Sequence, residues 1–170
     1  YHVYTAEQLA YVLSTDQEWK YIYLENDIYL NDLSDFEIWE MVGSEHNWIS
    51  NDNVSKFTHV SIYGNNHMIY GLFDYNEGGS AGLVHTNKTQ GHLSFYNLGI
   101  DYAYIGGKYA SAFLGTMDTG NNGYCNVTFE NCFVGENVKI IGTEGSGGFI
   151  GGYGWYSGIQ APTLPKTARL

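Results

Sequence analysis

The sequence predicts an all-β chain in which short strands stack as a parallel β-solenoid. Two observations carry this prediction. Short segments of alternating apolar and polar residues, separated by Gly, Asn and Asp, fill most of the chain. Two sequence elements also recur three times in one order, with spacings between 30 and 36 residues. Equivalent segments at such a period bury a continuous core by stacking on one another.

The N-terminal segment predicts the one helix of the chain, over roughly residues 5–14. Thr5 followed by Gln8 forms a capping-box pattern, in which two helix-end donors are satisfied. Apolar residues then recur at helical spacing on one face: Ala6, Leu9, Ala10, Val12 and Leu13. We expect this segment to cover the otherwise open first rung of the stack.

The first repeated element is His59–Tyr63, which recurs at 92–96 and 126–130 with offsets of 33 and 34 residues. Because successive side chains of a strand point to opposite faces, the copies predict two inward stacks and one outward hydroxyl row. The inward stacks would be Val60/Leu93/Val127 and Ile62/Phe95/Phe129, and the outward row Ser61/Ser94/Thr128. His59 and His92 occupy equivalent positions, which favours a structural stack of imidazoles over a metal site.

The second repeated element spans residues 81–85, 111–115 and 147–151, with offsets of 30 and 36 residues. Small residues precede each aromatic or aliphatic pair, which predicts tight corners where backbone approaches backbone. Propeller blades need about 40–45 residues each, so they do not fit this period.

Composition narrows the classes of partner. The 170 residues carry a formal net charge of −11, which argues against nucleic acid and against an anionic membrane surface. No apolar run approaches ~18 residues, so no inserted span is expected. Residues 1–158 hold all the acids, whereas residues 159–170 hold both prolines, Lys166 and Arg169.

These features divide the chain into three parts. Residues 1–16 would be the N-terminal capping segment with its helix, and residues 17–158 the parallel β-helix with repeats of about 33 residues. Residues 159–170 would form a flexible tail or linker.

No residues converge into a recognisable catalytic, cofactor or metal site. The carboxylates are scattered through loops, the six histidines lack metal-ligand spacing, and nucleophile and phosphate-binding motifs are missing. Cys125 and Cys132 would lie on opposite faces of one continuous strand, so a bridge between them needs a turn near Asn131. We favour two buried free thiols, with pairing left open.

Two C-terminal segments suggest binding or anchoring. Tyr153, Trp155 and Tyr156 follow flexible glycines and predict a surface for sugar stacking or for docking a neighbouring domain, unless they close the last rung. The segment Leu164, Pro165, Lys166, Thr167 and Ala168 resembles a sortase sorting signal with Ala in place of the last Gly. A Pro-containing linker is the alternative.

The order of motifs resembles bacterial surface proteins built around GLUG repeats. The resemblance covers about residues 4–156, and its repeat element matches at 81–84, 112–115 and 148–151. The family signature continues at residues 62–72, although its Asp-Gly-Asn-Gly turn is Tyr63-Gly64-Asn65-Asn66 here, so Asn66 would take the left-handed conformation. The resemblance implies a right-handed parallel β-helix exported to the cell surface. Such modules occur in adhesins, in S-layer-like proteins, and as the non-catalytic front part of immunoglobulin A1 metallopeptidases.

The expected function is therefore a non-enzymatic, secreted adhesin or stalk module on the cell surface of a Gram-positive bacterium, anchored to the wall if the tail is a sorting signal. Its partners would be a host glycan, a host protein, or neighbouring domains of the same surface protein. A polysaccharide-processing β-helix enzyme, a phage-tail depolymerase and a substrate-binding domain of a surface protease remain alternatives. The sequence leaves the ligand and the oligomeric state open.

Overall fold

The computed structural model describes residues 1–15, 17–39, 48, 59–88, 90–118 and 124–154. Its regular structure is mostly β-strand, together with one α-helix, α1 (Ala6–Ser14), and the short 3-10 helix η1 (Phe36–Ile38). The prediction of an all-β chain with one N-terminal helix is confirmed. None of the helices in these ranges is long and apolar enough to cross a membrane.

The strands form four sheets in which every pairing is parallel. The first sheet contains β1 (His2–Val3), β2 (Trp19–Leu24), β4 (His59–Tyr63), β8 (His92–Tyr96) and β12 (Asn126–Glu130). The second contains β3 (Ile28–Tyr29), β5 (Met68–Tyr70), β9 (Gly99–Asp101) and β13 (Phe133–Val134). The third contains β6 (Phe73–Ala81), β10 (Ala103–Ser111) and β14 (Val138–Gly147). The fourth contains β7 (Val84–Lys88), β11 (Leu114–Asp118) and β15 (Ile150–Gly154).

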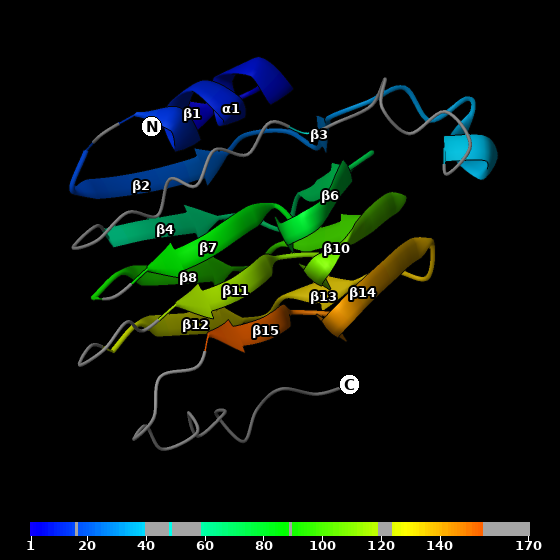
Figure 1. The fold of residues 1–170 in the computed structure, drawn as a ribbon. Coiled ribbons are helices and arrows are strands. Elements are labelled where there is room, and N and C mark those ends of the chain that lie inside the picture. Colours follow the sequence, from blue (N-terminus) through cyan, green and yellow to red (C-terminus); the bar gives the residue numbers. More distant parts are fainter. Residues whose placement is uncertain (16, 40–47, 49–58, 89, 119–123, 155–170) are drawn as a thin grey trace.

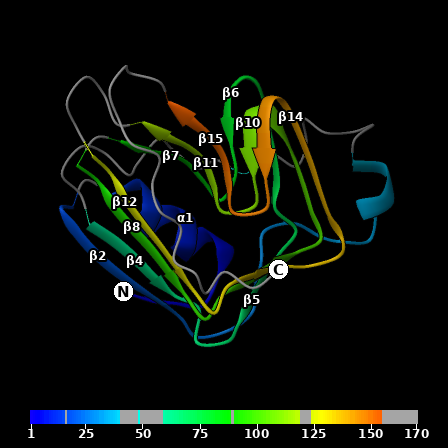
Figure 2. The ribbon, with the colours of Figure 1, turned by 90° about the horizontal axis from the view of Figure 1, so that it is seen from below.

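The chain visits these sheets in a fixed order, and we call one passage through all four a circuit. Within the described ranges, three circuits have a strand in every sheet: β4 to β7, β8 to β11 and β12 to β15. β2 and β3 precede them. Each strand pairs with its counterpart in the neighbouring circuit, so the circuits lie one above the other (Figure 1). Viewed along the stack, their paths nearly superimpose (Figure 2).

The first sheet has the predicted one-to-one register. Ile62 pairs with Phe95 and Phe95 with Phe129, and the last two rings stack with centroids 5.3 Å apart. Ser61, Ser94 and Thr128 form the predicted outward row. Both the inward stacks and the hydroxyl row are therefore confirmed.

The second and third copies of the second repeated element have the predicted register, since Ser111 pairs with Gly147 and Leu114 with Ile150. The first and second copies keep it at one end only. Val84 pairs with Leu114 at the expected offset, whereas Ala81 pairs with Ala110 rather than with Ser111. The corner between Ala81 and Val84 is therefore one residue shorter than the corner between Ala110 and Leu114. Gly82 lies in the shorter corner with φ 153°. This conformation suits glycine because a side chain there would be strained.

Asparagine forms the corner that follows the first sheet. Asn66 has the predicted left-handed conformation (φ 65°), and Asn65 shares it (φ 52°). In the later circuits Asn97 and Asn131 each have φ 51°, and the Asn131 amide Nδ2 donates to Asn97 Oδ1 over 3.1 Å. Asn tolerates this region better than most residues and can bond to its counterpart in the neighbouring circuit.

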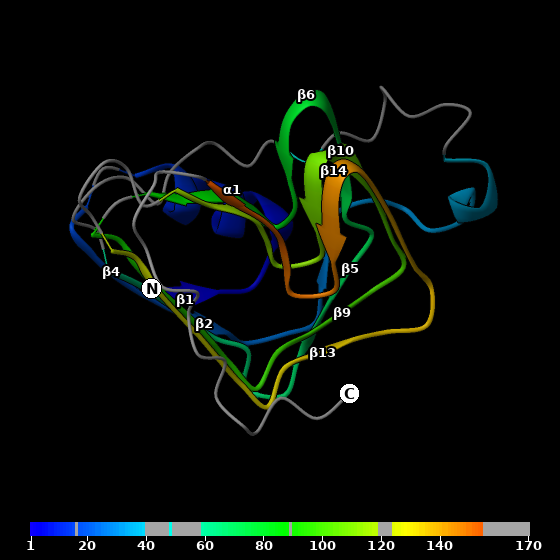
Figure 3. The same ribbon diagram turned by 60° about the horizontal axis from the view of Figure 1, so that its bottom comes forward.

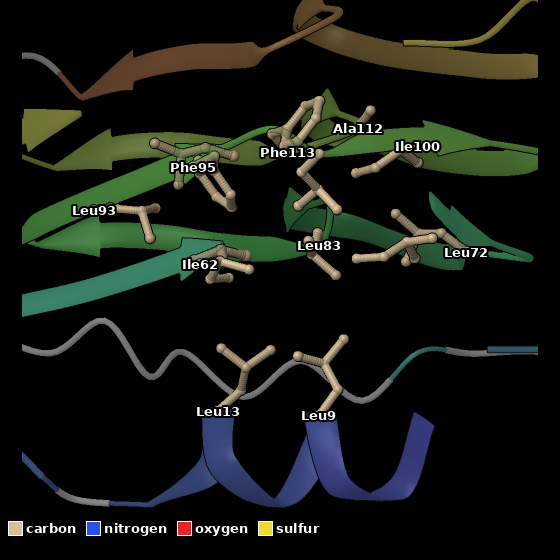
Figure 4. Close-up of a cluster of buried hydrophobic side chains, with 14 of the residues drawn as sticks. Leu9, Leu13, Ile62, Leu72, Leu83, Leu93, Phe95, Ile100, Ala112 and Phe113 are labelled. Carbon is tan, nitrogen blue, oxygen red and sulfur yellow. The ribbon is translucent and has the colours of Figure 1, made fainter. Parts of the chain in front are cut away.

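Helix α1 covers the N-terminal end of the core. Leu9 and Leu13 are buried and point toward the stacked strands (Figure 4). The Gln8 N–H donates to Thr5 Oγ1 over 3.3 Å, as the capping box predicts. Gln8 Oε1, however, accepts from the N–H of Tyr4 (2.7 Å), one residue before the cap.

The inward side chains of the last circuit are less buried than those of the preceding circuit. Leu93 and Phe95 are 0% exposed, whereas their counterparts Val127 and Phe129 are half-buried. No strand among the described residues pairs with the free side of β12. Among the described residues, α1 covers one end of the stack, and no helix or strand covers the other end beyond the third circuit. Figure 3 shows β13, β14 and β15 of the third circuit.

Cys125 and Cys132 are free thiols. Cys125 is buried and Cys132 half-buried, so burial of both is confirmed only in part. Burial raises the pKa of Cys125 to about 11 and also raises the pKa of Cys132. The turn at Asn131 exists, yet the two sulfurs do not bond.

Candidate functional site

The outward side of the first sheet carries three rows of side chains that cross its strands, and we call this surface the ladder face. The first row contains Trp19, His59, His92 and Asn126. The middle row contains Tyr21, Ser61, Ser94 and Thr128. The third row contains His2, Tyr23, Tyr63, Tyr96 and Glu130. The strict alternation of the strands places all three rows on the same face.

The first row is a continuous stack of rings. The Trp19 and His59 rings are parallel with centroids 3.8 Å apart, and those of His59 and His92 lie 4.2 Å apart at 15°. The Asn126 amide ends the row by donating from Nδ2 to His92 Nδ1 over 3.1 Å. Burial, and next the neighbouring His59, lower the pKa of His92. The predicted imidazole stack is confirmed.

The third row is a stack of phenols. Tyr23 and Tyr63 have ring centroids 4.8 Å apart, and Tyr63 and Tyr96 follow at 4.9 Å, with interplanar angles of 11° and 13°. The pKa of Tyr63 is raised, mainly by burial and to a smaller extent by the neighbouring Tyr96 and Tyr23. A hydrogen bond with Ser61 has the opposite effect on this pKa. The ring faces cover one another, so this row offers ring edges and hydroxyl groups to a ligand.

The middle row differs from its two neighbours in size. Ser61, Ser94 and Thr128 are small, half-buried hydroxyl residues between rows of rings. At the N-terminal end Tyr21 takes this position and is 46% exposed. The face therefore has hydroxyls along its centre and aromatic groups along both sides.

Trp19 stands at the end of the first row and is 54% exposed. One face of its indole lies on His59. The next strand of the sheet, β1, pairs only with Tyr23 and Leu24, so it does not extend over Trp19. A large apolar ring exposed at the end of an ordered row is a typical anchor for a ligand.

The rows of the ladder face contain no Lys or Arg, and Glu130 is their one carboxylate. The protein as a whole carries a net charge of −11. The face thus offers neutral hydrogen-bonding groups and aromatic surface rather than a cationic site for an anion.

A second polar cluster lies at the corner between the third and fourth sheets. Asp74 Oδ2 is 2.6 Å from His85 Nε2 and accepts the Gly82 N–H over 2.8 Å. The Asp74 and His85 side chains are 5% and 14% exposed. These contacts fix the tight corner at Gly82. Within the described ranges no three His, Cys, Asp or Glu side chains form a potential metal site.

Of the sequence-predicted site residues, the structure describes only Tyr153, and Tyr153 does not lie on the ladder face. Tyr153 lies in β15 of the fourth sheet, where it pairs with Met117. The remaining predicted positions lie outside the described residues: Trp155, Tyr156, Leu164, Pro165, Lys166, Thr167 and Ala168. Sequence reasoning overlooked the phenol row, although Tyr63 and Tyr96 recur at the same offset as His59 and His92.

The chain matches no known protein family, no curated protein and no solved structure in the comparisons made with each. The likeness to GLUG-repeat proteins therefore rests on the motifs quoted above.

Proposed function

We propose that the chain is a right-handed parallel β-helix module of a bacterial cell-surface protein, and that it is a non-catalytic adhesin-like unit presenting the ladder face to a ligand. Support for the architecture comes from the parallel pairing of every strand and from the fixed order of sheets in each circuit. The motif resemblance supports an extracellular, wall-associated location, with a host glycan or host protein as the partner.

The ladder face is the observation that carries this proposal. Rings and hydroxyls recur there in register across β2, β4 and β8, and the core does not require them because they point outward. Trp19 and Tyr21 remain about half exposed. Contiguous aromatic surface of this kind typically marks an interaction site. A stack of hydrogen-bonded strands also holds the groups rigidly, which lowers the entropic cost of binding.

The test is binding of the purified chain to a panel of host glycans and extracellular host proteins. We expect the double variant Tyr21→Ser/Tyr63→Ser to lose binding by about tenfold or more. The matched control is Tyr4→Ser/Tyr11→Ser, which removes two tyrosines that are 52% and 68% exposed but lie outside the ladder face. Unchanged binding by a folded ladder variant, or no binding to any member of the panel, would overturn the proposal.

A further inference from the structure

Resting on the proposed function, we infer that the ladder face binds a neutral, linear, equatorially linked polysaccharide. The sugar chain lies across the strands, parallel to the rows, with about one sugar residue for each strand crossed. Its end residue packs against the exposed edge of the Trp19 indole. Four features of the face lead to this ligand: its repeat distance, its hydroxyl row, its terminal indole and its charge.

The repeat distance favours an extended polymer. Along the phenol row, one hydroxyl-bearing ring follows another at 4.8 and 4.9 Å. These distances equal the spacing of neighbouring strands, about 4.7–4.9 Å. An extended β-1,4-linked chain advances by nearly this distance per residue, and its neighbouring residues face opposite ways. A single chain can therefore place one residue at each strand and repeat the same contacts on every second strand.

The middle row supplies the polar contacts. The hydroxyls of Ser61, Ser94 and Thr128 can each donate and accept a hydrogen bond, as sugar hydroxyls also do. Imidazoles on one side and phenols on the other add further donors and acceptors at the same repeat. Small side chains between larger ones leave the sugar ring access to both sides.

Trp19 provides the apolar contact. Stacking covers the ring faces of His59 between Trp19 and His92, whereas β1 does not extend over the outer face of the indole. A sugar chain that lies along the rows meets the exposed edge of the indole, and the carbon-bound hydrogens of an equatorially substituted pyranose provide an apolar surface for that contact. Tyr21 lies beside Trp19, with ring centroids 6.5 Å apart, and enlarges the platform.

The charge of the face excludes acidic polymers as the preferred ligand. A uronic-acid or sulfated chain needs Arg or Lys partners, and the three rows contain neither. The net charge of −11 would repel such a chain further. A neutral glycan has no such cost.

The experiment is calorimetric titration of the full chain with β-1,4-linked gluco-, manno- and chito-oligosaccharides of two to six residues. We expect affinity for one series to rise up to about four residues and then to level off, since four strands carry the middle row. Trp19→Ala should weaken the longest ligand about tenfold or more. Ser94→Val should weaken it less, and Tyr11→Ala, a control on the exposed side of α1, should leave it unchanged.

Two further measurements distinguish a variant that has lost binding from one that has lost its fold. Circular dichroism and thermal unfolding of each variant separate lost binding from lost folding. Affinity that does not depend on length, equal binding of polygalacturonate, or wild-type binding by folded Trp19→Ala would overturn the inference. If the ladder face binds a host protein but no oligosaccharide, this inference fails while the proposed function stands. If it binds neither class, both fail.

Discussion

Apolar side chains point into the core at both ends of the stack, but the two ends differ in how far the described residues cover these side chains. At the N-terminal end, α1 places Leu9 and Leu13 over the core, and both side chains are buried. At the other end, Phe129 is half-buried although its counterpart Phe95 is 0% exposed. Because the two phenylalanines occupy equivalent positions, their burial depends on the neighbouring circuit rather than on the local sequence. In a stack of this kind, stability therefore belongs to the contacts between circuits.

The largest expected effect comes from truncating the two equivalent phenylalanines. Phe95→Ala should lower the free energy of unfolding by about 3–5 kcal/mol, because it leaves a cavity between two circuits. Phe129→Ala should cost roughly half as much, since less apolar surface is removed from water there. Urea denaturation of the two variants measures both values. Equal losses would mean that the end at Phe129 is covered in solution.

An intermediate effect is expected at the end covered by α1. Thr5→Ala removes the hydroxyl that accepts the Gln8 N–H and should cost about 1 kcal/mol. Thr5→Ser retains the acceptor and should restore most of the stability. Thermal unfolding of both variants gives the comparison. A Thr5→Ala protein as stable as the wild type would show that the α1 cap does not limit the stability of that end.

The smallest effect concerns the outward side of the same strands. The folded pKa of His92 is lowered, so below about pH 6.5 the unfolded chain binds more protons than the folded one. Stability should therefore fall as the pH decreases from 7 through this range, by less than in the variants above. His92→Phe keeps a ring in the row but cannot titrate, so its unfolding free energy should depend less on pH. Identical pH profiles would contradict this assignment.

The sequence was sufficient to predict the helix, the strand class and the register of β4, β8 and β12. Each of these depends on local periodicity or on residues that recur at a constant offset. It was not sufficient to identify β2 as a further copy, because Lys20 stands where the later copies have Val60 and Leu93. Lys20 is 1% exposed, and its ammonium donates to the carbonyl of Leu13 in α1 over 3.1 Å. The position of the helix thus supplies a partner for that inward lysine.

The sequence predicts a strand at Tyr21–Leu24 but not its place in the repeat, which explains why the candidate site was predicted elsewhere. Without β2 in the repeat, Trp19, Tyr21 and Tyr23 have no assigned place, and the outward residues of β4 and β8 look like a short structural ladder. The sequence instead drew attention to Tyr153 and its neighbours, whose glycine-rich surroundings suggest exposure. Alternation alone indicates which residues share a face, but the number of strands on that face depends on pairing between distant segments.

The one-to-one register of the first sheet gives the molecule a unit of growth. Joining the chain that precedes His59 directly to His92 would remove 33 residues and leave every remaining inward side chain inward. Inserting one residue into such a strand would instead turn its apolar side chains toward solvent. Gain or loss of whole copies is thus the tolerated route of length variation for this chain, and each added copy lengthens the ladder face by one strand.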